Sequence, residues 1–228
     1  MIETVPIITI DGPTGSGKGT ISRRLARDLD WHLLDSGALY RLVALVAANK
    51  SIDLADERQL TTAAAEMAVK FSSAADEEQI FLDGIDVTAQ LRTEERGASA
   101  SKVAALPRVR EALLGRQRNL AKIPGLVADG RDMGTVVFPN ASLKLFLTAS
   151  PMERALRRYN QLKDKGIDVS LPGLSREIAE RDERDAMRKV APLRPAADAR
   201  TLDSTGMTPD DVVRQIRLWL SELRESEN

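Results

Sequence analysis

A glycine-rich loop that ends in a lysine carries the clearest chemistry in this sequence. The loop follows a short apolar run, Ile7–Asp11, and precedes a segment in which apolar residues recur every four positions from Ile21 to Leu29. Glycines let backbone N–H groups converge on an anion, the start of a helix adds partial positive charge, and Lys18 reaches outer phosphates. The order strand, loop, helix therefore predicts a nucleotide-phosphate site made of Gly12, Pro13, Thr14, Gly15, Ser16, Gly17, Lys18, Gly19 and Thr20.

The residue after the lysine bears on metal binding. Loops of this type often carry Ser or Thr there, whose hydroxyl ligates magnesium, whereas this chain has Gly19. We therefore expect Mg²⁺ at this loop to be held largely through water and phosphate oxygens. No side chain is assigned as a metal ligand.

Polar residues follow the second and third apolar runs. Ligands of open α/β sheets collect beyond the carboxyl ends of strands, so Ser36 and Arg41 are expected beside the phosphate loop. A capped helix start with a solvent-facing arginine explains these two equally well. In the run DGRDMGT from 129 to 135, Arg131 could neutralise a phosphate and Asp132 could accept a hydrogen bond from a base amine. Two acids and an arginine within four residues favour a functional turn there.

A predicted helix, Leu174–Lys189, has almost no apolar stripe. Arg181, Arg184, Asp185 and Arg188 share one of its faces. Such a helix is either a solvated salt-bridge ladder or the wall of an anion-binding cleft.

A second basic cluster lies upstream of that helix. Arg154, Arg157 and Arg158 precede the run KDKG from 163 to 166, which is typical of a mobile hairpin tip. Two arginine-bearing helices joined by such a loop predict a lid at about 154–170 that delivers charge to phosphates.

Composition narrows the class of protein. The chain has 228 residues, a formal net charge of -1 and no cysteine. These values exclude disulfides and thiol nucleophiles, and they argue against nucleic-acid or membrane binding through a global basic field. The first apolar run leads straight into the phosphate loop, so we interpret it as a strand rather than a signal peptide. A cytoplasmic enzyme fits these features.

Five apolar runs separated by helical patterns predict an α/β fold with a buried parallel sheet covered by helices on both faces. They are Ile7–Asp11, His32–Leu34, Leu126–Asp129, Leu143–Leu147 and Arg200–Asp203. A final helix is expected after Thr208, with Pro209 at its first position and an apolar face from Val212 to Leu223.

The long stretch between the second and third runs predicts an inserted domain that closes over a substrate. Its expected elements are strands at Met67–Ser72, Gln79–Asp83 and Ile85–Thr88, a helix at Ala98–Leu106 and a second helix from Pro107 to Leu120. Asp83-Gly84 is expected to form a hairpin turn.

Five motifs, in order along the chain, closely resemble those of bacterial cytidylate kinases: GPTGSGKGT at 12–20, DSGALYR at 35–41, PRVREALL at 107–114, DGRDMGTVVFP at 129–139 and ERDERDAMRKVAPL at 180–193. The resemblance covers essentially the whole chain. It implies a P-loop kinase core at 1–36 and 107–228, with the lid inside it, and a monophosphate-binding domain at 37–106. It also implies Mg²⁺-dependent transfer of the ATP γ-phosphoryl group to CMP or dCMP.

The resemblance assigns roles to individual positions. Lys18, Arg131 and Arg188 are the implied catalytic residues, and Arg157 joins the glycine loop in binding ATP. The implied acceptor-site residues are Arg41, Arg131 and Arg188 at the phosphate, Ser36, Ser101, Arg110 and Asp132 around the cytosine, and Arg181 and Asp185 at the sugar.

Two other functions stay open at this point. The nearer is a P-loop kinase for another small acceptor, such as UMP or AMP. The more distant is a nucleotide-dependent switch, which would not need the clustered arginines. We expect a monomer with ATP and CMP or dCMP as its partners, and no nucleic acid or membrane.

Overall fold

The computed structural model describes residues 5–72, 79–164 and 166–226. The chain forms two compact units. The first comprises Met1–Asp35 and Asn119–Asn228, and the second comprises Ser36–Arg118. Within the described residues, none of the helices is long and apolar enough to cross a membrane.

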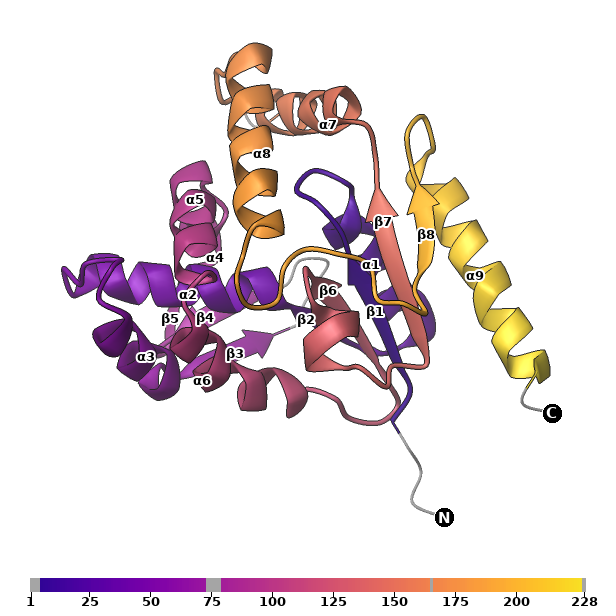
Figure 1. Ribbon diagram of the computed structural model, residues 1–228, viewed down its shortest axis with the longest axis horizontal. Coiled ribbons are helices and arrows are strands. Elements are labelled where there is room, and N and C mark those ends of the chain that lie inside the picture. Colours follow the sequence, from indigo (N-terminus) through magenta and orange to yellow (C-terminus); the bar gives the residue numbers. More distant parts are fainter. Residues whose placement is uncertain (1–4, 73–78, 165, 227–228) are drawn as a thin grey trace. The chain divides into compact units, whose positions relative to one another are not determined.

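The first unit is built on a five-stranded parallel sheet (Figure 1). Its strands are β1 (Ile7–Asp11), β2 (His32–Asp35), β6 (Leu126–Gly130), β7 (Leu143–Thr148) and β8 (Arg200–Asp203), in the order β2-β6-β1-β7-β8. The predicted strands are confirmed. The expectation that β8 is buried was wrong, because β8 is an edge strand in which half-buried and exposed residues alternate.

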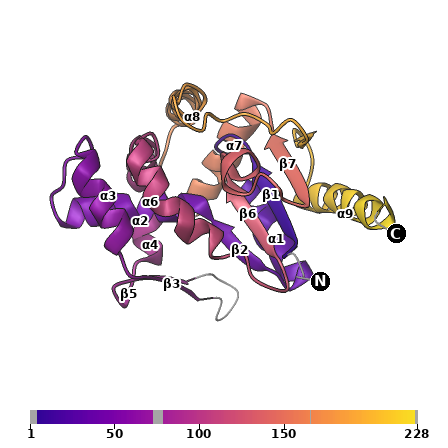
Figure 2. The same ribbon diagram turned by 60° about the horizontal axis from the view of Figure 1, so that its bottom comes forward.

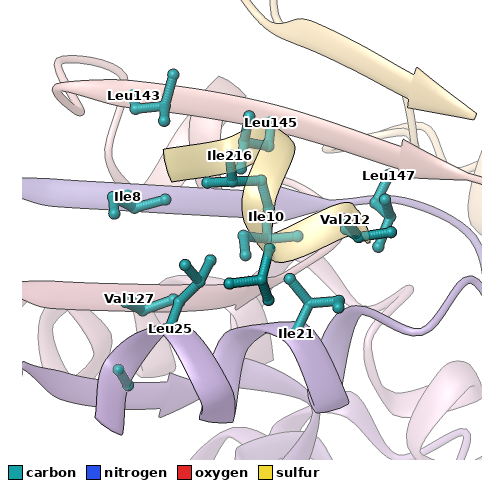
Figure 3. Close-up of a cluster of buried hydrophobic side chains, with 12 residues drawn as sticks. Ile8, Ile10, Ile21, Leu25, Val127, Leu143, Leu145, Leu147, Val212 and Ile216 are labelled. Carbon is teal, nitrogen blue, oxygen red and sulfur yellow. The ribbon is translucent and has the colours of Figure 1, made fainter. Parts of the chain in front are cut away.

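Side chains of β1 alternate between the two faces of the sheet. Ile8 and Ile10 join a core with α1 (Lys18–Leu29) and α9 (Pro209–Ser226), as Figure 3 shows. Thr9 points to the other face, where a Cβ on Gly134 would lie 2.9 Å from its Oγ1. Gly134 belongs to η1, a π-helix at Met133–Val137. Both faces of the sheet are therefore covered, as predicted.

The last helix begins as its sequence predicts. The Thr208 hydroxyl accepts from the backbone N–H of Asp211 at 3.2 Å, and the Asp211 carboxylate accepts from the backbone N–H of Thr208 at 3.1 Å. This reciprocal cap satisfies two donors that a helix start leaves without partners.

Two helices pack together in the predicted lid region: α7 (Pro151–Lys163) and α8 (Leu171–Ala186) (Figure 1). Ser150 caps the first and Ser170 caps the second. The prediction of a helix to Lys189 was wrong at its end, since α8 stops three residues earlier. Of the predicted hairpin tip, Lys165 lies outside the described residues.

The second unit combines helices with a small antiparallel sheet, β3-β4-β5 (Figure 2). Its elements are α2 (Ser36–Asn49), α3 (Glu57–Glu66), β3 (Val69–Ser72), β4 (Gln79–Leu82), β5 (Ile85–Asp86), α4 (Thr88–Leu91), α5 (Glu94–Val103) and α6 (Pro107–Arg118). Asp83 and Gly84 have φ values of 52° and 83°, which suit the expected two-residue turn. α5 starts earlier than predicted because the Thr93 side chain caps it by accepting from the Arg96 N–H.

The boundary of this unit differs from the expected insert, 37–106. Helix α6 belongs to the second unit rather than to the sheet-bearing core, because it packs against α3. The main chain N–H of Arg108 also donates to the Glu57 carboxylate at 2.8 Å. That 37–106 acts as a monophosphate-binding domain stays a prediction.

Candidate active site

The loop between β1 and α1 has the backbone that a phosphate cradle requires. Gly17 has a φ of 93° directly before the first residue of α1, a conformation that strongly favours glycine. A Cβ on Gly12 would lie 2.0 Å from the carbonyl oxygen of Leu147 on β7. These glycines let the loop turn tightly against the sheet.

Lys18 is buried at the first position of α1, and its ammonium group folds back onto the loop. Nζ donates to the Pro13 carbonyl oxygen at 2.8 Å and to Ser16 Oγ at 3.4 Å. Burial, and then the positive charge of Arg131, lower the pKa of Lys18 to about 7, while Asp129 acts in the opposite direction. An anion beside this ammonium would restore its full charge. The site is therefore suited to a polyphosphate.

Three groups from distant elements hold Thr14 in the loop. Its N–H donates to Asp182 Oδ1 at 3.3 Å, and its carbonyl accepts from Arg154 Nη1 at 2.9 Å. Its hydroxyl accepts from Arg131 Nη2 at 3.0 Å. Arg154 and Asp182 also form an ion pair with each other. The loop is thus tied to α7, to α8 and to the turn after β6.

Asp185 is the centre of a buried ion-pair cluster. Arg131 Nε donates to Asp185 Oδ2 at 2.8 Å, and Arg188 pairs with Oδ1. Burial by itself raises the pKa of Asp185, but Arg131, Arg188 and Arg181 together hold that pKa below its usual value. Burial of the Asp185 and Arg188 side chains excludes a fully solvated ladder at this end of α8.

Two details of α8 differ from the sequence prediction. Arg188 does not extend the helical face of Arg181 and Asp185, because it lies beyond the last residue of α8. Leu174 and Ile178 are buried, so the first half of α8 does present a short apolar stripe. The cluster of Arg181, Asp185 and Arg188 therefore lies on the second half of α8 and just beyond its end.

Arg157 contacts the phosphate loop from α7. Its Nη1 donates to the Ser16 carbonyl oxygen at 3.3 Å and to Ser204 Oγ at 3.0 Å. Glu153, one turn earlier on α7, accepts from Nε at 2.8 Å and orients the guanidinium. This placement beside the loop is what an ATP-binding role for Arg157 requires.

The remaining predicted acceptor residues divide between the two units. Asp132 is buried in the first, directly before η1. In the second, Ser36 and Ser101 are buried, and Arg41 is half-buried on α2. Arg110 is also buried, and it lies 5.6 Å from the centroid of the Tyr40 ring and donates to the Ala104 carbonyl oxygen at 3.1 Å. That the predicted acceptor residues of the two units bind the same acceptor molecule stays a prediction.

The residues at the carboxyl end of β6 fit a magnesium ion that is bound mainly by phosphates. Among the residues that the structure describes, no three His, Cys, Asp or Glu side chains gather in a way that could hold a metal ion. Asp129 is buried there, with Oδ2 3.3 Å from the position that a Cβ on Gly19 would take. Magnesium commonly takes one or two carboxylates and completes its shell with waters and substrate phosphates.

Comparison with known proteins agrees with this geometry. The family model for cytidylate kinase matches residues 8–221. The chain belongs to the cytidylate kinase family. It is 56% identical to the cytidylate kinase of Photobacterium profundum over 228 residues, which cover 100% of both chains. It is 59% identical to that of Pseudomonas putida over 224 residues, covering 97% of this chain and 98% of the relative.

A solved structure supports the fold alone. An uncharacterized protein from Eubacterium ventriosum has a TM-score of 0.52 and 12% identity, covering 96% of this chain and 99% of its own.

Membership of the cytidylate kinase family, together with the phosphate loop, makes this chain a nucleoside monophosphate kinase. The resemblance in five motifs is thereby confirmed.

Two carboxylates of this cytidylate kinase fold were not singled out from the sequence. Asp182 holds Thr14 and Arg154, and Asp11 accepts hydrogen bonds from two backbone N–H groups of η1. Burial raises the pKa of Asp11 to about 7, although the hydrogen bonds from Gly134 and Met133 lower it. The available signal for Asp11 was its place at the carboxyl end of β1, the same rule that drew attention to Asp129 on β6.

Proposed function

We propose that this protein transfers the γ-phosphoryl group of ATP directly to the phosphate of CMP or dCMP. The observation that carries the proposal is that the phosphate loop contacts the ion-pair cluster of Arg131, Asp185 and Arg188. Arg131 joins them, because it donates both to Thr14 of the loop and to Asp185 beside Arg188. A kinase needs such an arrangement, since two polyanions must approach each other.

The donor nucleotide would bind along the glycine loop, Gly12–Thr20, with Arg157 beside it. Lys18, Arg131 and Arg188 would be the catalytic residues. Guanidinium groups stay charged at physiological pH and match phosphate oxygens with two N–H groups. Catalysis of phosphoryl transfer is mainly positioning and stabilisation of spread charge, which these side chains supply.

The acceptor would be held by charge at one end and hydrogen bonds at the other. We assign Arg41, Arg131 and Arg188 to its phosphate and Arg181 with Asp185 to its sugar. Ser36, Ser101, Arg110 and Asp132 would line the cytosine. We further propose that 37–106 and the lid at 154–170 close over bound nucleotides, and that the protein works as a cytoplasmic monomer.

Magnesium would enter with ATP. When bound, it would supply positive charge that offsets the charge of the substrate phosphates. Asp129, whose carboxylate lies close to Gly19 at the start of α1, would hold its water shell. Lys18 and the arginines then act on phosphate oxygens from the protein side.

An acceptor panel tests the function. ADP release would be measured with ATP, Mg²⁺ and either CMP, dCMP, UMP or AMP. We expect CMP and dCMP to give the highest kcat/KM. A preference for UMP or AMP would identify a different monophosphate kinase, and slow ATP turnover that no acceptor stimulates would indicate a nucleotide switch.

Base selection should depend on Asp132. Cytosine offers an amine at position 4, which a carboxylate accepts from, whereas uracil offers a carbonyl that the carboxylate repels. A mismatched polar pair in a closed pocket costs about 1–3 kcal/mol, or roughly tenfold to a hundredfold. Asp132→Ala should therefore lower kcat/KM for CMP much more than for UMP. Equal losses for the two acceptors would show that Asp132 does not contact the base.

A further inference from the structure

We propose that Asp11 is a positioning residue for acceptor selection. Its carboxylate fixes the turn after β6, which carries Arg131 and Asp132. The inference rests on the proposed function, in which Asp132 reads the base. In the hydrogen bonds described below, the side chain of Asp11 contacts backbone groups. We therefore infer that it acts through this turn rather than on the nucleotide.

Both oxygens of Asp11 are used by the turn. Oδ1 accepts from the N–H of Met133 at 2.9 Å, and Oδ2 accepts from the N–H of Gly134 at 2.8 Å. These are the first N–H groups of η1, which a helix start leaves without partners in the helix itself. A carboxylate there also interacts favourably with the helix dipole. Asp11 is only 4% exposed, so water does not compete for these bonds.

Asp132 directly precedes the two residues whose N–H groups these bonds hold, Met133 and Gly134. Its own carbonyl oxygen accepts from the N–H of Val136 at 2.9 Å and of Val137 at 3.2 Å. The peptide group between Asp132 and Met133 is therefore held at both ends. Its carbonyl oxygen accepts from η1, and its N–H donates to Asp11. Such π-helical turns are rare and occur often at functional sites. Loss of the Asp11 contacts would release the backbone that directs the Asp132 side chain.

The sheet brings Asp11 and the turn together. Asp11 pairs with Gly130 in the register of β1 and β6, so the strand end and the turn are neighbours. Gly134 packs against Thr9 and the aliphatic part of Lys144, where a Cβ would meet Oγ1 at 2.9 Å and Cδ at 3.2 Å. Because Asp11 also directly precedes Gly12, a single residue joins the start of the phosphate loop to the acceptor turn.

The test is the Asp11→Asn variant, assayed for kcat/KM with CMP and UMP and for the KM of ATP. The amide retains one acceptor oxygen and places an NH₂ group against the second N–H. We expect kcat/KM for CMP to fall at least about tenfold, and the preference for CMP over UMP to shrink by about fivefold or more. The KM of ATP should change less than kcat/KM for CMP, since the loop keeps its glycine geometry and its contacts with Asp182 and Arg154. In an Asp132→Ala background, the same Asp11→Asn change should leave the acceptor preference unaltered.

Asp211→Asn is the matched control. Asp211 also accepts from a backbone N–H at a helix start, that of Thr208, but on α9. It should lower stability without changing the CMP preference. If Asp11→Asn loses stability in the same way and keeps the preference, Asp11 is only a structural cap and the proposal is overturned.

A second variant covers the case in which Asp11→Asn does not fold. Gly134→Ala pushes the same turn away from Thr9 and Lys144 while leaving Asp11 in place. It should reduce the CMP preference in the same direction, and an unchanged preference would also overturn the proposal. A wild-type enzyme without activity on CMP would instead contradict the proposed function itself.

Discussion

Replacement of Lys18 by methionine is expected to lower kcat with ATP and CMP by at least about 100-fold, as for other groups that stabilise charge on a transferring phosphoryl. Lys18 begins α1 at the end of the glycine loop, and its ammonium group contacts the loop itself at Pro13 and Ser16. Methionine keeps the length and the apolar stem of the side chain but removes the charge. The measurement is steady-state ADP release, and turnover like that of the wild type in a folded variant would remove Lys18 from the mechanism.

The stability of the Lys18→Met variant provides the control. The pKa of Lys18 is about 7 in the folded protein, against 10.5 for an exposed lysine. Between these pH values the unfolded chain binds one more proton, so this residue makes the unfolding free energy of the wild type rise with pH by up to about 1.4 kcal/mol per unit. At pH 7 the variant should therefore be at least as stable as the wild type, and its advantage should shrink toward pH 10. A variant that is unfolded at pH 7 would contradict this account of the buried ammonium.

Asp185→Asn is expected to cost about 3–5 kcal/mol of folding stability, the usual consequence of removing one partner from a buried ion pair. Asp185 is the shared anion of Arg131 and Arg188, and its side chain is 1% exposed. With the charge gone, the guanidinium groups repel each other in a site that is buried from water. Activity should fall as well, because both arginines are assigned to the transferring phosphoryl group. Urea unfolding of ligand-free protein is the measurement.

Glu183→Gln is the matched control for this change. Glu183 lies two residues earlier on α8 and its side chain is exposed, so the loss of its charge should alter stability by less than about 0.5 kcal/mol. If Asp185→Asn is as harmless as Glu183→Gln, the ion-pair cluster does not contribute to the stability of the site. Addition of ATP and CMP should partly restore the Asp185→Asn variant, because their phosphates supply the missing negative charge.

The sequence alone was sufficient for the elements whose cause is local. An apolar run predicted β1 at its observed bounds, the bounds predicted for β8 were also observed, and Thr208-Pro209 marked the start of α9. The glycine loop was recognisable because left-handed backbone and close approach to a strand restrict which residues fit. The types of residue expected at an anion site were also readable, since arginine and lysine are the side chains that supply positive charge to phosphates there.

Long-range contacts decided the rest. Nothing local predicts the strand order β2-β6-β1-β7-β8, because the pairing of parallel strands depends on how the intervening helices pack. Asp11 and Met133 are separated by 122 residues, so their hydrogen bond leaves no spacing pattern in the sequence. The end of α8 at Ala186 likewise followed from tertiary structure, since Arg188 pairs with buried Asp185 from outside the helix. Which arginines are solvated and which are held in the site is therefore a property of the folded chain, set by the carboxylates that packing brings to them.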